Sequence, residues 1–122
     1  MAHANFHLAA GIAVGTAATA LPLVRAWLAD QPVARPIARM LIASYALGFW
    51  AVIPNAITTL GGPASVHHAW WSNVFLGHAA IDRRLEEGLL IGELAIAAAF
   101  VAHYALILLA LRRSKRLSQP RP

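Results

Sequence analysis

Residues 89–111 read LLIGELAIAAAFVAHYALILLAL, and Arg112-Arg113 follow directly. A hydrocarbon core about 30 Å thick needs roughly 20 consecutive apolar residues in a helix. This run is long enough, and Glu93 is its only charged residue. Two further runs of similar length lie at 4–24 and 40–60. The three runs predict an all-α integral membrane protein with three transmembrane helices.

The composition agrees with lipid as the solvent. Of the 122 residues, 59% are hydrophobic and 12% are charged, whereas soluble domains carry about 25% charged residues. Because cysteine is absent, disulfides and thiolate ligands are excluded. The net charge of +5 does not indicate nucleic-acid binding, because the basic residues lie between and after the apolar runs without interleaved aromatics. It predicts contact with anionic lipid headgroups at the basic tail.

The basic residues also predict an orientation. The segment between the first two runs and the stretch after the third run hold eight of them: Arg25, Arg35, Arg39, Arg112, Arg113, Lys115, Arg116 and Arg121. The segment between the second and third runs holds only two, Arg83 and Arg84. The positive-inside rule therefore places the N-terminus outside and the C-terminus in the cytoplasm.

The expected single membrane domain divides at the ends of these runs. We expect transmembrane helices at 4–26, 38–60 and 88–112, a cytoplasmic loop at 27–37, an outer segment at 61–87 and a cytoplasmic basic tail at 113–122. In the outer segment, apolar residues recur near one helical face, and Trp70-Trp71 suit the headgroup level. This pattern predicts an interfacial amphipathic helix over about 65–86.

Pro54 falls inside the second apolar run. Proline lacks a backbone donor and crowds the preceding helical turn, so it bends or breaks a helix. The sequence therefore predicts a kink near 52–54, where Asn55 and Thr58 could satisfy the freed backbone groups.

Small residues recur four positions apart in every run. Such spacing lets helix backbones approach closely within a membrane. Two interpretations remain open, namely packing among the chain's own helices and docking against helices of a partner subunit. The expected helix-packing residues are Gly11, Gly15, Ser44, Gly48, Gly88 and Gly92.

Histidines and acidic residues gather on the predicted outer side. His78 and Asp82 are four apart and share a helix face. Neutral imidazoles together with a carboxylate are ordinary ligands of zinc and similar divalent metals. The alternative interpretation is that interfacial histidines hydrogen-bond to headgroups and backbone. The candidate metal ligands are His7, His67, His68, His78, Asp82 and Glu93.

Three short motifs, Phe6-His7-Leu8-Ala9-Ala10-Gly11, Ile53-Pro54-Asn55-Ala56-Ile57 and Gly77-His78-Ala79-Ala80-Ile81-Asp82, occur in this order. This order resembles that of the membrane-bound metal-dependent hydrolases of bacterial inner membranes. The resemblance covers about the first two-thirds of the chain. It implies a metal-dependent activity and a location in a bacterial inner (cytoplasmic or intracytoplasmic) membrane. Where that family carries acidic ligands after the proline, this chain has Asn55 and Ala56.

His103 lies deep in the third run. An ionisable residue at membrane depth is a functional candidate by default. Its setting, with Ala99 before it and Ile107 after it, resembles locally the histidine by which antenna polypeptides of purple bacteria ligate bacteriochlorophyll. The resemblance implies His103 as a pigment ligand. The alternative is an interhelical hydrogen bond, which we favour.

Two functions from different classes are consistent with these features. The first, which we favour, is a small non-catalytic accessory subunit packed into a larger membrane complex of an energy-transducing or photosynthetic kind. The second is a metal-dependent hydrolase acting at the outer face of the inner membrane. The cofactor expected is accordingly a divalent metal or a bacteriochlorophyll-type pigment, and the expected partners are other membrane subunits.

Overall fold

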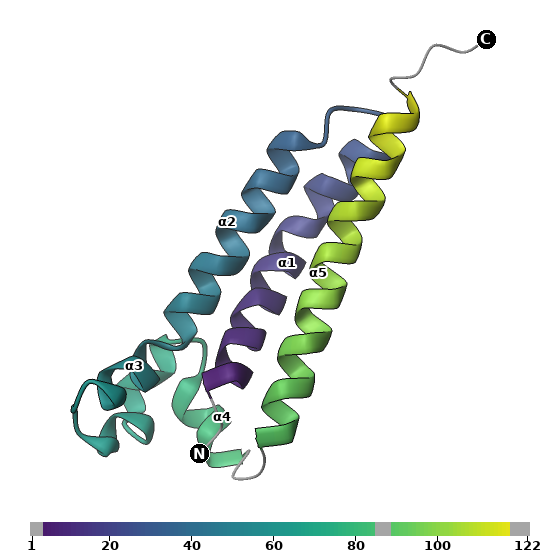
Figure 1. The fold of residues 1–122 in the computed structure, drawn as a ribbon. Coiled ribbons are helices and arrows are strands. Elements are labelled where there is room, and N and C mark those ends of the chain that lie inside the picture. Colours follow the sequence, from purple (N-terminus) through teal and green to yellow (C-terminus); the bar gives the residue numbers. More distant parts are fainter. Residues whose placement is uncertain (1–3, 85–88, 118–122) are drawn as a thin grey trace.

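The computed structural model describes residues 4–84 and 89–117, and within these ranges every regular element is a helix. Three long helices run side by side as an elongated bundle, and short helices close one end of it (Figure 1). We call residues 53–84 the cap, and the opposite end of the bundle the basic end. The helices are α1 (Ala4–Leu28), α2 (Ala34–Ala51), α3 (Ile53–Thr59), α4 (His78–Arg84) and α5 (Leu89–Leu117), with 3₁₀ turns η1 (Ala64–His67) and η2 (Trp70–Val74).

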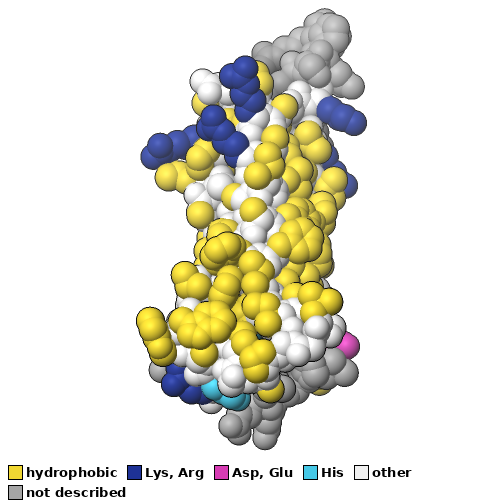
Figure 2. Space-filling view, turned by 90° about the vertical axis from the view of Figure 1, so that its left-hand side faces the viewer, with side chains coloured by type: hydrophobic (Ala, Val, Ile, Leu, Met, Phe, Trp, Pro, Cys, Tyr) yellow, Lys and Arg dark blue, Asp and Glu magenta, His cyan; other side chains and the backbone are white. Residues whose placement is uncertain are grey.

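The chain has the helices of a membrane-embedded protein. Two segments, Ala4–Leu28 and Leu90–Lys115, are each long and apolar enough to cross a bilayer. A third candidate is the pair α2 and α3, which qualifies only when the two helices are taken together and is bent by 45°. Figure 2 shows hydrophobic side chains over the length of the bundle, with most Lys and Arg side chains at the basic end.

The bend between α2 and α3 falls where Pro54 predicts it. Helix α2 ends at Ala51, and the next residue, Val52, has φ and ψ angles of −93° and 0°, which are not helical. Pro54 then occupies the first turn of α3. Backbone N–H groups in a first turn have no intrahelical acceptor, so proline is tolerated there. The Thr58 hydroxyl lies 2.9 Å from the Asn55 carbonyl oxygen, to which it donates. The bend therefore marks the start of the cap.

Glycines let α1 and α2 approach at backbone distance. A Cβ built on Gly15 would lie 2.6 Å from the Ser44 nitrogen, and one built on Gly11 would lie 2.6 Å from the Gly48 nitrogen. No real side chain tolerates such distances, so these glycines are required for the packing. The structure therefore places both glycines against a helix of the same chain. Gly92 is buried on α5, while Gly88 lies outside the described residues.

The single amphipathic helix expected over 65–86 is wrong. Instead, η1, η2 and α4 follow one another with sharp turns between them. Ala69 is extended, and Leu76 and Gly77 have positive φ angles of 53° and 74°. These conformations interrupt a helix. They fold the cap back on itself, so that residues of η1 face residues of α4. Trp70 remains 82% exposed at its surface.

Candidate metal centre

Four side chains from three elements converge where the cap meets the start of α1. They are His7 of α1, His67 of η1, and His78 and Asp82 of α4, and all are buried. The Asp82 carboxylate joins them, because one oxygen lies 3.0 Å from His7 Nε2 and the other lies 2.9 Å from His67 Nδ1. His78 Nε2 lies 3.4 Å from Asp82 Oδ2 and 3.0 Å from His67 Nδ1.

Three of these separations are hydrogen-bond distances of 2.9–3.0 Å, and the fourth, 3.4 Å between His78 Nε2 and Asp82 Oδ2, is that of two ligands on one tetrahedral ion. Zinc bound to nitrogen or oxygen at about 2.0–2.1 Å keeps its ligand atoms about 3.3–3.4 Å apart by tetrahedral geometry. Ligand atoms of His7, His78 and Asp82 all lie within 4.8 Å of one another, which allows one ion to contact the three. His67 Nδ1 lies within 3.0 Å of ligand atoms of both α4 residues but outside this group of three, and it would be the fourth donor of a tetrahedral site. The donor set of three imidazoles and a carboxylate suits zinc and similar divalent ions.

Local structure explains why these side chains point inward. His78 and Asp82 are four residues apart in α4, so they lie on one helix face. Gly77, with its positive φ, starts the turn that leads into α4, and His67 ends η1. The rings of His7 and His78 stack with centroids 3.8 Å apart and planes inclined by 22°, which places both Nε2 atoms beside the carboxylate.

Thr58 orients the His67 ring. Its hydroxyl oxygen lies 3.1 Å from His67 Nε2. In the tautomer that carries its hydrogen on Nε2, His67 donates to Thr58, and Thr58 donates to the Asn55 carbonyl oxygen. The Nδ1 lone pair of His67 is then free to point at the other three donors. A metal-binding histidine ordinarily has its second nitrogen held in this way.

Electrostatics favour a neutral His78. Burial, and secondarily the neighbouring His7, lowers the pKa of His78 from 6.5 to about 4. At neutral pH the imidazole therefore keeps the unprotonated nitrogen that a metal ligand needs. Asp82 is the carboxylate of the cluster, and it would offset part of the charge of a divalent ion bound there.

The lowered pKa predicts how the stability of metal-free protein depends on pH. Between pH 6.5 and 4 the unfolded chain takes up a proton at His78 that the folded chain does not. Stability should therefore fall as the pH falls through this window, with a slope of at most about 1.4 kcal/mol per pH unit from this group. Thermal unfolding of chelator-treated protein in detergent measures it. The exchange His78→Gln should remove this part of the slope, and an unchanged slope in that variant would contradict the assignment.

The other candidate ligands lie elsewhere. His68 is adjacent in sequence to His67 but is exposed, and Glu93 is exposed on α5. Neither belongs to the group of ligand atoms from His7, His78 and Asp82 that is found among the described residues, and neither has a contact with that group like those of His67. Thr58 was not predicted as a partner of the site. The position of Thr58 four residues after Pro54 indicates only a contact with the backbone. Its contact with His67 could not be predicted, because it depends on the turn between α3 and η1.

His103 lies in a separate polar cluster halfway along the bundle. Its Nδ1 is 2.8 Å from the Thr16 hydroxyl, which is 3.1 Å from the Ser44 hydroxyl. The Tyr45 ring meets the His103 ring edge-on at 5.9 Å. Because the His103 ring is completely buried, a tetrapyrrole could reach its Nε2 only if the helices moved apart. These contacts are those of an interhelical hydrogen-bond partner.

No protein-family model, curated protein or solved structure matches this chain. Its fold and side chains nevertheless define a class, which is that of membrane-embedded helical proteins with a buried cluster of three histidines and one carboxylate.

Proposed function

We propose that this chain is a small multi-pass membrane protein whose cap is held by a tetrahedral divalent ion, with zinc as the best fit. The convergence of His7, His67, His78 and Asp82 carries the proposal. Two of these residues are 75 positions apart, so their meeting is a property of the fold and not of a local sequence pattern.

The proposed topology has three spans, with the bent pair α2 and α3 as the second. The cap and its metal centre lie on the outer side, and the basic end lies in the cytoplasm. The asymmetry of arginines and lysines between the two ends supports this orientation. The motif resemblance supports a bacterial inner membrane. In this arrangement Trp70 and Trp71 of the cap lie at headgroup level, where an indole is half apolar and half wet.

A closed metal centre favours a non-catalytic role. With His67 as the fourth ligand, four protein donors would fill a tetrahedral coordination sphere, whereas catalytic zinc sites keep one position for water. The centre therefore clamps the cap onto α1, and the chain acts as an accessory subunit of a larger membrane assembly. Gly11 and Gly15 pack inside the chain, so a partner helix would contact α5. The surface of α5 turned away from α1 carries Leu90, Leu94 and Val101, each more than 60% exposed.

A metal-dependent hydrolase is the second candidate. It is favoured by the meeting of His7, His78 and Asp82, which are the residues that the motif resemblance implies. Asn55, in the family's acidic position, lines a hollow with Ala4, and its side-chain oxygen is buried without a hydrogen-bond partner in the described chain. In this alternative His67 is not a ligand, and a metal in the site would activate water by lowering its pKa to about 7.

Cobalt substitution distinguishes a closed centre from an open one. Protein purified with Co²⁺ should hold one ion per chain and show the intense visible absorption of a tetrahedral site. If four protein donors fill the site, azide should leave the spectrum unchanged. A band shift on addition of azide would instead show an open position and support the hydrolase.

Two adjacent histidines provide matched variants for this experiment. His67→Ala should open the site and make the spectrum sensitive to azide, whereas His68→Ala should behave as the parent protein. A parent protein that binds no Co²⁺ or Zn²⁺ would refute the metal centre itself.

A further inference from the structure

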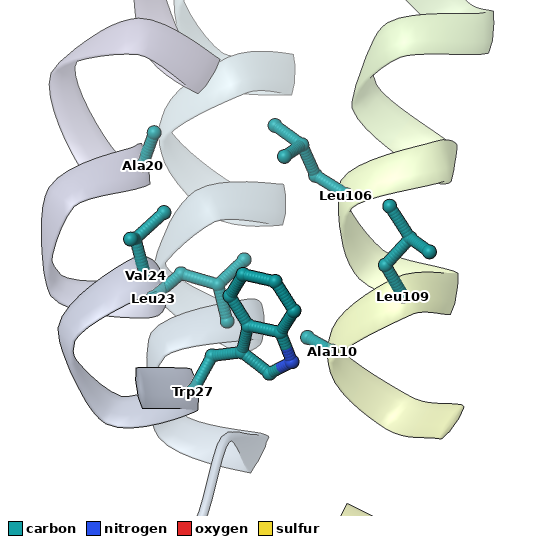
Figure 3. A pocket seen from close by; sticks show the side chains of 7 residues that line it. All are labelled: Ala20, Leu23, Val24, Trp27, Leu106, Leu109 and Ala110. Carbon is teal, nitrogen blue, oxygen red and sulfur yellow. The ribbon is translucent and has the colours of Figure 1, made fainter. Parts of the chain in front are cut away.

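An apolar pocket lies between α1 and α5 near the basic end, away from the metal centre. One of its lining residues is Trp27, whose indole ring lies between the two helices with its nitrogen on the side of Ala110 (Figure 3). Ala20 and Trp27 are seven residues apart on α1, so the pocket extends about 10 Å along the bundle. Its lining residues are Ala20, Leu23, Val24, Trp27, Leu106, Leu109 and Ala110. We call it the α1–α5 pocket.

Trp27 brings one polar atom into this apolar lining. Its Nε1 is buried and has no hydrogen-bond partner among the described residues. A buried indole N–H ordinarily finds an acceptor. The lining supplies none, because every other side chain in it is aliphatic. An oxygen atom of a molecule that enters the pocket could accept a hydrogen bond from this N–H.

A positive charge lies next to the same indole. The Arg113 guanidinium lies 5.3 Å from the centre of the Trp27 ring. Its Nε and Nη2 are 3.1 Å and 3.0 Å from Asp30 Oδ1, so Asp30 holds one edge of the guanidinium. The guanidinium has five N–H donors, which leaves its other edge able to bind an anion. Arg25 and Arg112, both exposed, add charge at this level.

We propose that the α1–α5 pocket binds one anionic phospholipid from the leaflet at the basic end. The pocket, Trp27 and Arg113 follow one another along the bundle in the order in which a phospholipid carries its acyl chain, ester carbonyl and phosphate. The acyl chain fills the aliphatic lining, a carbonyl oxygen accepts from Trp27 Nε1, and the phosphate contacts Arg113. Basic pockets between transmembrane helices recognise anionic headgroups in this way, and guanidinium groups suit phosphate oxygens.

Charge selects this occupant over a second copy of the chain. The basic end of each copy carries an excess of arginine, so two copies would repel one another there. An apolar partner helix would leave the Trp27 N–H without an acceptor, because the backbone carbonyls of a helix are already bonded within it. A phospholipid supplies both the acceptor and the negative charge.

Native mass spectrometry of the whole protein in mild detergent tests the proposal. Dioleoyl phosphatidylglycerol and dioleoyl phosphatidylcholine, which share their acyl chains, are titrated separately. We expect one bound phosphatidylglycerol, held at least tenfold more tightly than phosphatidylcholine. Trp27→Phe, which keeps an aromatic side chain but removes the indole N–H together with the five-membered ring, should weaken binding of both lipids several-fold. Arg113→Gln should remove most of the preference for phosphatidylglycerol.

Matched variants separate the pocket from diffuse attraction. Arg39→Gln removes an exposed arginine on α2, and Trp50→Phe removes an indole N–H that donates to the Val74 carbonyl oxygen outside this pocket. Both should leave the affinity within twofold. Ala110→Leu fills the pocket without changing charge, and it should abolish the tight site. Equal affinity for the two lipids, or equal losses in the control variants, would overturn the proposal. A dimer that Ala110→Leu dissociates would assign the pocket to a second copy.

Discussion

Replacing Gly15 with alanine should lower the thermal stability of the protein more than any exposed substitution in α1. A Cβ at this position would collide with the α2 backbone at Ala43 and Ser44. Backbone atoms cannot rotate away as a flexible side chain can, so the two helices must separate. Overpacking of this kind costs about 1–3 kcal/mol, and Gly15→Leu should cost more. The midpoint of thermal unfolding in detergent, followed by circular dichroism, measures the loss.

Exposed positions on the same helix provide the control. Ala13 and Ala17 flank Gly15 and face away from α2. Ala13→Leu and Ala17→Leu should therefore leave the unfolding midpoint almost unchanged. Separation of α1 from α2 would also break the Thr16–Ser44 contact. If Gly15→Ala unfolds at the same temperature as the parent protein, the close approach of α1 and α2 is wrong.

Removing the Asp82 carboxylate should release the cap and, if the proposed metal centre forms, its ion as well. Asp82 contacts all three histidines of the centre, and the exchange Asp82→Ala leaves those imidazoles buried without their anion. Loss of one partner from a buried charged cluster typically costs about 3–5 kcal/mol. We expect no zinc in the purified variant, a lower unfolding midpoint, and rapid proteolysis between α3 and α4 while α1 remains intact.

Two comparisons make this result specific. Asp82→Asn retains shape and an oxygen donor but loses the charge, so it should bind zinc more weakly than the parent and more tightly than the alanine variant. His68→Ala, beside a ligand but exposed, should match the parent in zinc content and proteolysis. Full zinc content in Asp82→Ala would exclude the carboxylate as a ligand.

Periodicity and run length predicted the parts of this fold that depend on local sequence. Long apolar runs predict membrane helices directly, because lipid offers no hydrogen-bond partners and the backbone must form its hydrogen bonds within the helix. The bend at Pro54 follows from a missing backbone donor. In the same way, the four-residue spacing of His78 and Asp82 was enough to place them on one face.

The cap could not be predicted in this way. Its apolar residues recur as in an amphipathic helix, but Gly77 has a positive φ angle and interrupts the helix. The glycine is visible in the sequence as a possible helix breaker. The prediction of a single helix gave more weight to the pattern of apolar residues. Sequence also could not choose between His67 and His68, because the choice depends on where η1 ends and on the contact with Thr58. Glu93 was expected on the same side of the membrane as these histidines, but its side chain does not point toward them.

The 75-residue separation of His7 and Asp82 has a consequence for biosynthesis. A ribosome adding roughly 5–20 residues per second needs about 4–15 s to make the chain between them. During that interval the first helix is already available to the insertion machinery, while its buried imidazole has none of its final partners. The centre can close only after translation has passed α4. A chain truncated before that point would present an unsatisfied histidine to quality-control proteases.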